Sequence, residues 1–206
     1  MEKKIYIEVG SNVGDDTARF VNDDSLVYCF EPCMELAFNL WKKYKKMDNV
    51  IILPFAIDIE NKFKKFNVSA ALENWGCSSL NDFNSNISNE WSDRKDFFFT
   101  DSYMVPTITL ADFINLYEIK YIDYLWIDAQ GHDFNVIKGL GNKINIVKEG
   151  RCEAAYNVSL YKNINNNHKD IINYLNIFGF ETQLQLDQSP IGAECDIHFW
   201  YENKII

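Results

Sequence analysis

The sequence lacks the features that mark secreted, membrane-spanning and zinc-binding proteins. It contains no run of 18 apolar residues, and its first residues, Met1-Glu-Lys-Lys4, lead into a strand-like run and not into a signal peptide. The five cysteines form no CxxC pair and have no zinc-ligand spacing, and their number is odd. Unpaired thiols are typical of a reducing compartment. We therefore expect a cytoplasmic protein with mostly buried thiols and no membrane contact.

Positive charge is also scarce. The chain has 20 Lys and Arg against 30 Asp and Glu, which gives a formal net charge of −10. A field of that sign repels phosphate backbones, so we expect no unspecific binding of nucleic acid. The length of 206 residues fits one domain, and a chain of that size buries a sufficient core without cross-links.

Short apolar runs alternate with helical patterns in the first third of the chain. Residues 5–9, 26–30 and 50–57 are expected to be buried strands, and residues 17–21 and 34–44 the helices between them. Such alternation is typical of a parallel sheet with helices on both faces. The sequence therefore predicts a doubly wound α/β fold.

The second half continues the pattern and ends differently. Helices are expected at 109–117, 133–140 and 169–178, a strand at 121–127, and another within 144–155. The last two expected strands, 180–186 and 195–201, are joined by a turn around Ser189-Pro-Ile-Gly192 and can form an antiparallel hairpin.

Between the two halves lies a polar segment, residues 72–101, after an added strand at 62–68. It is rich in Asn, Ser and Asp but also carries Trp75, Trp91 and three consecutive phenylalanines at 97–99. Long irregular segments inside a domain are usually functional or disordered, and the aromatic residues argue against disorder. We interpret the segment as a lid or substrate-binding insertion in a single domain, 1–206.

The strongest local motif is Glu8-Val-Gly-Ser-Asn-Val-Gly14, where a strand enters a glycine turn and leaves as a helix. Gly10 permits the tight turn, and Gly14 permits close approach of the backbone to a ligand. Glu31 follows Gly10 by 21 residues (31 − 10) at the end of the second strand, where an acid accepts hydrogen bonds from ribose hydroxyls.

Two nucleoside cofactors fit this layout. Nicotinamide cofactors usually meet GxGxxG, but Asn12 and Asp15 occupy the second and third glycine positions. An acid such as Glu8 beside the turn suits the amino group and sulfonium of S-adenosylmethionine (SAM) and disfavours a pyrophosphate. The motif therefore favours SAM, while a turn without any ligand stays an alternative.

A second motif is Trp126-Ile-Asp-Ala-Gln-Gly-His132, in which Asp128 follows an apolar strand. Ligands of open α/β sheets bind outside the carboxyl ends of the strands, so we expect Asp128 in the site. His132 lies near the start of the next helix and is a candidate base or hydrogen-bond partner of the substrate. Helix capping is the alternative role for both residues.

The order of these motifs resembles the FkbM-type methyltransferases. The resemblance rests on residues 8–14, Phe30-Glu-Pro32, Pro54-Phe-Ala-Ile57, Gly76-Cys-Ser-Ser-Leu80 and Ile127-Asp-Ala-Gln-Gly-His-Asp133, followed by Phe134-Asn-Val-Ile-Lys-Gly139. It implies a mostly parallel seven-stranded sheet with an antiparallel C-terminal strand. It also implies SAM-dependent methyl transfer, mostly to hydroxyl oxygens of sugars or natural products, and so a small-molecule or carbohydrate substrate.

The resemblance also assigns roles to single residues. The residues expected to bind SAM are Gly10, Asn12 and Gly14 at the methionine, Glu31 at the ribose, Ala56 and Ile57 at the adenine, and Ser78 and Ser79 at the carboxylate or substrate. Asp128 is expected to face the site of transfer. Gln130 stands where the family often has Glu, and an amide is neither a carboxylate base nor a strong metal ligand, so no metal is expected.

Two other functions stay open from the residues. One is an NAD-dependent oxidoreductase on a related sheet. The other is a binding protein with a methyltransferase fold that has lost catalysis, an alternative that Gln130 supports.

Overall fold

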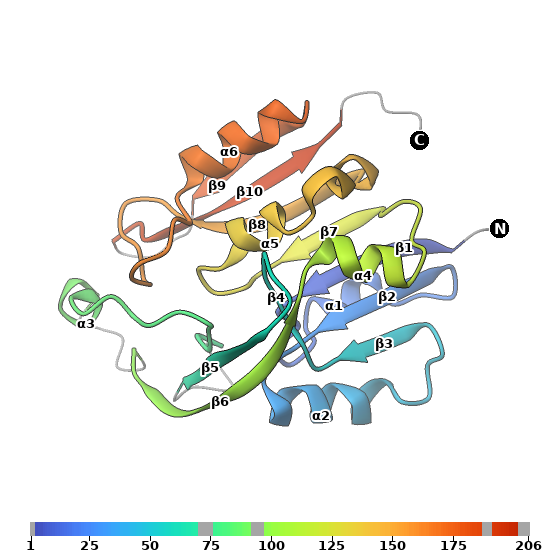
Figure 1. Ribbon diagram of the computed structural model, residues 1–206, viewed down its shortest axis with the longest axis horizontal. Helices are drawn as coiled ribbons and strands as arrows, with labels where there is room; N and C mark the ends of the chain where they lie inside the picture. Colours follow the sequence, from blue (N-terminus) through green and yellow to red (C-terminus); the bar gives the residue numbers. More distant parts are fainter. Residues whose placement is uncertain (1–2, 70–75, 92–96, 187–190, 202–206) are drawn as a thin grey trace.

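The computed structural model describes residues 3–69, 76–91, 97–186 and 191–201, and a seven-stranded sheet forms its centre (Figure 1). The strand order is β3-β2-β1-β7-β8-β10-β9. All neighbours pair in parallel except β10, which is antiparallel to both β8 and β9. The strands are β1 (Lys4–Val9), β2 (Ser25–Phe30), β3 (Val50–Leu53), β7 (Tyr124–Ile127), β8 (Glu149–Ala155), β9 (Glu181–Leu186) and β10 (Glu194–Trp200). The expected fold class is confirmed.

Helices cover both faces of this sheet. Figure 1 shows α4, α5 and α6 in front of it and α1 behind it. The helices are α1 (Thr17–Phe20), α2 (Met34–Tyr44), α3 (Ile87–Glu90), α4 (Leu110–Leu116), α5 (Asp133–Lys138) and α6 (His168–Ile177), with a 3₁₀ helix at Gly141–Ile146. Two start at side-chain caps, because Thr109 and Asn167 each accept a 3.0 Å hydrogen bond from the backbone N–H three residues on.

The core lies between the sheet and the α4–α6 layer. Ile7 and Val9 of β1 are buried there, and Glu8 between them points to the other face because strand side chains alternate. The rings of Phe30 on β2 and Phe113 on α4 meet edge to face with centroids 4.8 Å apart. Burying one such ring stabilises the fold by roughly 1.5–3 kcal/mol.

The strand expected at 50–57 is wrong as a single element. The chain leaves the large sheet at Pro54, which has no N–H to donate to a ladder, and β4 (Ala56–Ile57) then joins a second sheet of order β4-β6-β5. Its other members are β5 (Phe63–Ser69) and β6 (Phe99–Ile108). No local pattern had indicated β6, because its stability comes from antiparallel pairing with distant β5.

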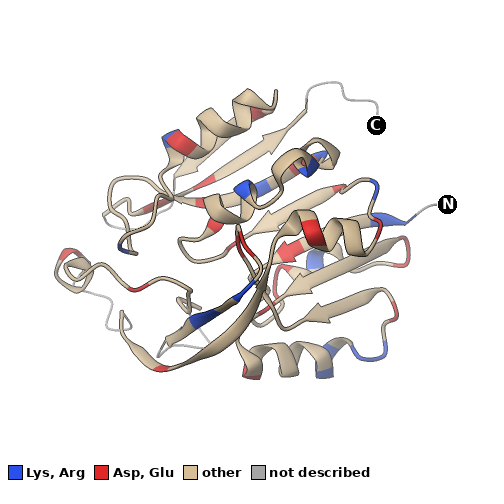
Figure 2. Cartoon of the chain, in the orientation of Figure 1, with Lys and Arg blue, Asp and Glu red and all other residues tan. Residues whose placement is uncertain are grey.

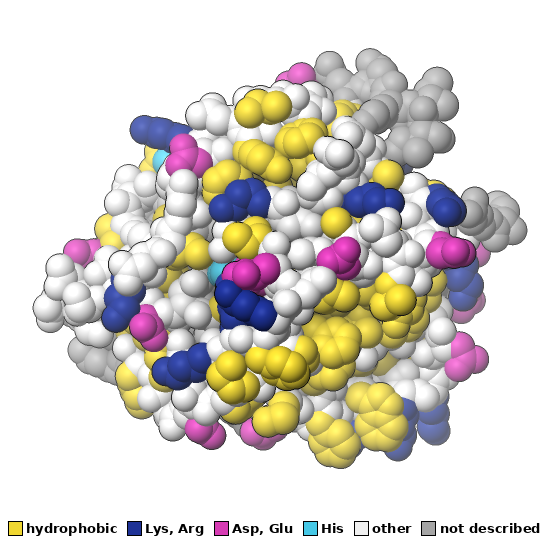
Figure 3. Space-filling view, in the orientation of Figure 1, with side chains coloured by type: hydrophobic (Ala, Val, Ile, Leu, Met, Phe, Trp, Pro, Cys, Tyr) yellow, Lys and Arg dark blue, Asp and Glu magenta, His cyan; other side chains and the backbone are white. Residues whose placement is uncertain are grey.

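Charged and apolar side chains are distributed unevenly over the surface. Figure 2 shows acidic residues on most elements and a group of basic residues near the end of α2. Figure 3 shows apolar side chains exposed on the face that carries α2 and β6. On α2, Phe38 and Trp41 are 57% and 50% exposed. All five cysteines are buried as thiols, as expected. Of the helices in the described ranges, none combines the length and apolar character that a bilayer crossing requires.

Candidate functional site

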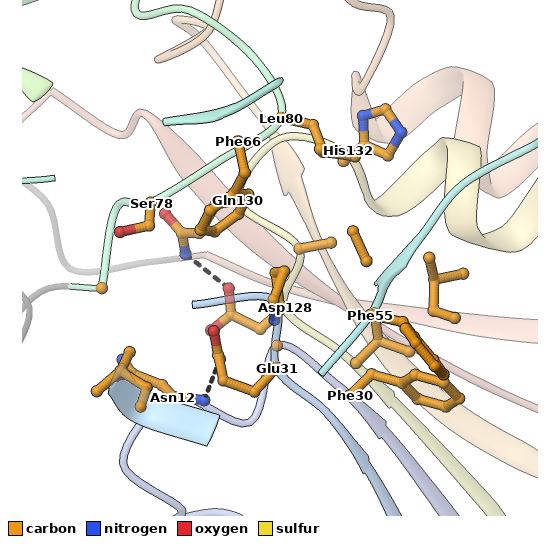
Figure 4. A pocket seen from close by; sticks show the side chains of 18 residues that line it. Asn12, Phe30, Glu31, Phe55, Phe66, Ser78, Leu80, Asp128, Gln130 and His132 are labelled. Atoms are coloured by element: carbon orange, nitrogen blue, oxygen red, sulfur yellow. Dashed lines mark hydrogen bonds between the residues drawn. The ribbon is translucent and has the colours of Figure 1, made fainter. Parts of the chain in front are cut away.

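A pocket lies outside the carboxyl ends of β1, β2 and β7, where the strand order of the sheet reverses direction (Figure 4). It holds about 680 Å³ of space that no atom fills, including its open mouth. The lining residues are Val9, Gly10, Asn12, Phe30, Glu31, Pro32, Leu36, Phe55, Ala56, Ile57, Phe66, Gly76, Ser78, Leu80, Asp128, Ala129, Gln130 and His132. Most of the residues singled out in the sequence therefore meet in one cavity.

Glu31 occupies the end of β2 with both carboxylate oxygens held. Oε2 accepts a hydrogen bond of 2.7 Å from the backbone N–H of Asn12, and Oε1 accepts one of 2.7 Å from that of Cys33. Burial raises the pKa of Glu31 to about 7, although both hydrogen bonds lower it. Each oxygen keeps a further lone pair, so the carboxylate can accept from two neighbouring hydroxyls.

The glycine turn brings β1 directly against the end of β7. Gly10 has φ +88°, and a Cβ built on it would stand 1.9 Å from the carbonyl oxygen of Asp128. Asn12, two residues later, also has a positive φ of +47°. Its side chain lies next to Gly76, where a Cβ would come within 2.3 Å of the Asn12 amide nitrogen. The turn thus packs on two other segments of the pocket wall.

Three residues expected to bind the donor lie behind the pocket lining. The Glu8 carboxylate is buried on the far side of β1 and accepts a 2.5 Å hydrogen bond from the Thr17 hydroxyl. Burial raises the pKa of Glu8 to about 7. Gly14 packs on Leu40 of α2, and the Ser79 hydroxyl donates to the carbonyl of Gln130 over 2.7 Å. These residues support the walls of the pocket from outside it.

Asp128, at the end of β7, faces the cavity from beside Gln130 and Ser78 (Figure 4). The amide nitrogen of Gln130 donates to Asp128 Oδ1 over 2.6 Å. Burial raises the pKa of Asp128, and the hydrogen bond from Gln130 opposes that rise. With one hydrogen bond from Gln130, the Asp128 carboxylate keeps further lone pairs that can accept from a ligand.

His132 is buried on another side of the pocket. Figure 4 shows it beside Leu80 and away from Glu31 and Asn12. Its Nε2 lies 2.8 Å from Oδ1 of Asp58, a buried residue whose other oxygen pairs with Lys64. Burial alone would raise the pKa of Asp58, but the bonds from His132 and Lys64 hold it well below its ordinary value. His132 is thus tied to an ionised carboxylate behind the wall.

Sequence reasoning missed Asp58 and Tyr161 and took Gln130 only as a departure from the family pattern. The Tyr161 hydroxyl lies 2.8 Å from Oε1 of Gln130 although the two residues are 31 positions apart. Nothing near Tyr161 in the sequence signals this contact. The sequence did single out Gln130, because it stands where FkbM-type methyltransferases often have Glu.

The described ranges contain no group of three His, Cys, Asp or Glu side chains that could hold a metal ion. The acidic residues of the pocket stand apart instead. Glu31 is held by two backbone amides and Asp128 by the side chain of Gln130. Two carboxylates in one cavity, Glu31 buried and Asp128 half-buried, suit a ligand that carries positive charge.

Comparisons with known proteins agree with this geometry. A search of curated proteins finds no match, but solved structures share the fold. An rRNA methylase from Streptococcus thermophilus matches with a TM-score of 0.51 and 10% identity over 98% of this chain and 89% of that one. Aeropyrum pernix fibrillarin with bound SAM matches with a TM-score of 0.53 and 9% identity over 96% and 66%.

A third structure, magnesium protoporphyrin IX methyltransferase from Synechocystis PCC 6803 with bound SAM, matches with a TM-score of 0.51 and 9% identity over 98% and 71% of the two chains. At such low identity these likenesses show the fold alone. The family model of the methyltransferase FkbM domain matches residues 8–182, a span that holds the whole pocket lining. The chain therefore belongs to the FkbM methyltransferase family.

Proposed function

We propose that this protein is a SAM-dependent O-methyltransferase that acts on a hydroxyl group of a sugar or a natural-product-like small molecule. Membership of the methyltransferase family removes the oxidoreductase alternative. The observation that carries the proposal is the position of Asp128 in the same cavity as Glu31, with one of its oxygens bonded to Gln130.

The pocket residues fit SAM as the donor. Glu31 offers two oxygens to the ribose hydroxyls, and the apolar side of the cavity, with Ala56 and Ile57, suits the adenine. Gly10 and Asn12 border the methionine part. The two carboxylates of the cavity, Glu31 and Asp128, favour a ligand with an ammonium and a sulfonium group. When bound, SAM supplies a methyl group that the positive sulfur already activates.

The chain then has two tasks, which are to align the acceptor and to accept its proton. Alignment accounts for much of the rate in such reactions. A hydroxyl oxygen becomes a better nucleophile as its proton leaves, and the Asp128 carboxylate is the proton acceptor that we assign. Its raised pKa makes it a stronger base than an exposed aspartate. His132, the second candidate base, lies on another side of the pocket, away from Glu31 and Asn12 (Figure 4), which favours Asp128.

The acceptor is a small molecule in this proposal. The Ser78 hydroxyl and the Gln130 amide line the cavity near Asp128 and suit a substrate with several hydroxyl groups. One structural neighbour is an rRNA methylase, but the net charge of −10 disfavours a polyanionic substrate. The residues 76–91 and 97–101, described parts of the expected insertion, would cover the bound acceptor.

The test is methyl transfer from labelled SAM to a panel of sugar and small-molecule hydroxyl acceptors. Asp128→Asn keeps the shape and loses the charge, so transfer should fall by roughly 10²–10⁴-fold while S-adenosylhomocysteine still binds. Asp23→Asn makes the same change at an exposed position and serves as the control. His132→Ala tests the other candidate base in the same assay.

Transfer should also persist in EDTA, because the described residues supply no metal cluster. Full activity of Asp128→Asn would refute the proton acceptor. Donor binding without transfer to any acceptor would favour the alternative of an inactive binding protein.

A further inference from the structure

The Gln130 side chain connects Asp128 to a residue from a distant part of the chain. Its Nε2 donates to Asp128 Oδ1 over 2.6 Å, and its Oε1 lies 2.8 Å from the Tyr161 hydroxyl. A primary amide is uncharged and both donates and accepts. Both ends of the Gln130 amide are therefore occupied, and its orientation has consequences at Asp128.

Tyr161 determines which end of the amide faces Asp128. Burial raises the pKa of Tyr161 well above its ordinary value, so the hydroxyl keeps its proton. That single hydrogen has two acceptors, Gln130 Oε1 at 2.8 Å and the carbonyl oxygen of Cys77 at 3.2 Å. While Tyr161 donates to the nearer Oε1, the amide nitrogen is turned toward Asp128.

The backbone around Gln130 is held in place on two sides. Gln130 has φ +50°, a conformation that costs energy for a residue with a side chain. The Ser79 hydroxyl donates to its carbonyl oxygen, and the next residue, Gly131, packs on the Tyr161 ring so closely that a Cβ there would stand 2.3 Å from a ring carbon. The backbone at Gln130 and Gly131 thus contacts Ser79 and the same tyrosine that binds the Gln130 side chain.

These contacts form a chain from Asp128 through Gln130 and Tyr161 to Cys77, and its first two links can run in either direction. With Asp128 ionised, Tyr161 donates to Gln130 and Gln130 donates to Asp128. With Asp128 protonated, the carboxyl donates to Oε1 after the amide turns, the amide nitrogen donates to the Tyr161 oxygen, and Tyr161 donates to the Cys77 carbonyl. The Asp128 carboxyl, the Gln130 amide and the Tyr161 hydroxyl each keep a hydrogen-bond partner in either state.

We propose that Gln130 and Tyr161 are positioning residues that present Asp128 as an oriented proton acceptor, and that their hydrogen bonds reverse direction once Asp128 has taken a proton. The inference rests on the proposed role of Asp128 as proton acceptor. Neither residue takes the proton itself. They keep the Gln130 amide nitrogen as a hydrogen-bond donor to Asp128 before the proton arrives. Afterwards they turn the amide oxygen toward Asp128 as a hydrogen-bond acceptor.

Gln130→Glu would abolish this arrangement. Two carboxylates would then stand at hydrogen-bond distance and share one proton, which strongly raises one of the two pKa values of the pair. Gln130→Met keeps the length and removes both hydrogen bonds. A bond to the charged carboxylate is stronger than the bond to the neutral acid, so losing both should raise the pKa of Asp128 by about one pH unit. Tyr161→Phe keeps the ring and should cause a smaller rise, because the amide is then free to turn.

The experiment is a titration of the protein labelled with ¹³C at the aspartate carboxyl carbons, followed by NMR. The Asp128 signal is assigned as the one missing from Asp128→Asn. Gln185→Glu, at an exposed position of β9, makes the same charge change and should leave the titration of Asp128 as in the wild type. Near-ultraviolet circular dichroism checks that each variant is folded.

An unchanged Asp128 titration in folded Gln130→Met and Gln130→Glu would overturn the inference. So would a rise in Gln185→Glu as large as that in Gln130→Glu, because net charge would then explain both. If Gln130→Met does not fold, Tyr161→Phe carries the same test. The titration needs neither SAM nor a methyl acceptor. A negative titration result can therefore be told apart from a lack of hydroxyl methylation in the transfer assay.

Discussion

Gly10 and Asp128 are in such close contact that a Cβ on the glycine would stand 1.9 Å from the aspartate carbonyl oxygen. The contact joins the ends of β1 and β7, the two strands between which the strand order reverses. It places the turn that borders the donor directly beside the proposed proton acceptor. Because the opposing atom is backbone, no side-chain rotation relieves a substitution at Gly10.

We expect Gly10→Ala to be strongly destabilising. A positive φ costs an L-residue roughly 1–2 kcal/mol, and the clash with Asp128 adds to it. Gly141→Ala is the matched control, because Gly141 also has a positive φ, +49°, but open space around its Cβ position. Urea denaturation should show a loss in the free energy of unfolding of about 4 kcal/mol or more for Gly10→Ala. Equal losses of unfolding free energy in both variants would mean that the backbone at Gly10 and Asp128 moves apart at little cost.

The second prediction concerns Glu31 and the ribose. Glu31→Ala removes the acceptor of two hydroxyl hydrogen bonds, each worth roughly 1.5–3 kcal/mol when the acceptor is charged. Calorimetry with S-adenosylhomocysteine should therefore show at least a tenfold weaker Kd. Glu35→Ala, an exposed acid in the first turn of α2, should bind like the wild type. Unchanged affinity of folded Glu31→Ala would remove Glu31 from the donor site.

The third prediction is a dependence of stability on pH. Burial raises the pKa values of Glu8, Glu31 and Asp133 to about 7, from ordinary values of 4.5, 4.5 and 3.8. The folded protein therefore keeps protons that the unfolded chain releases between these values. The free energy of unfolding should fall as pH rises through that window and level off above about pH 7.

Urea denaturation midpoints measured across this pH window test the expected fall of the free energy of unfolding with pH. Glu8→Gln should flatten it, because the amide oxygen still accepts from Thr17 and carries no charge to bury. Stability that increases from acidic to neutral pH would contradict the buried, protonated carboxyls. The same would hold if Glu8→Gln left the slope unchanged.

The fourth prediction concerns the insertion. Ile87 of α3 is 1% exposed and packs in a cluster with Phe97, Leu160 and Tyr161. Ile87→Ala should cost roughly 2–5 kcal/mol of local packing, so proteases should cleave this segment faster and transfer to the best acceptor should fall. Affinity for S-adenosylhomocysteine should be unchanged.

Ile177→Ala, at a position 79% exposed on α6, is the control and should behave like the wild type in all three measurements. Loss of S-adenosylhomocysteine binding in folded Ile87→Ala would assign the insertion to the donor site instead of the acceptor.

Most strands of the large sheet were predictable, because their apolar runs are local and end at glycine or polar residues. The expected strand 26–30 is one residue shorter than β2 (Ser25–Phe30), and the expected strand 121–127 includes all of β7 (Tyr124–Ile127). Because these sequence patterns are local, they gave wrong strand bounds at Pro54 and missed β6. At Pro54 an apolar run continues through a change of sheet, and β6 depends on a partner more than thirty residues earlier in the chain.

The sequence by itself determined the donor side of the site. The glycine turn, Glu31 and Asp128 each follow a strand end directly, and parallel strands bring their carboxyl ends to one edge, so these residues had to meet. Tertiary structure alone decided which groups control them. His132 meets Asp58 across 74 positions and Gln130 meets Tyr161 across 31. Such contacts are set by how loops pack over the sheet, and side-chain hydrogen bonds of this kind leave no periodic trace in a sequence.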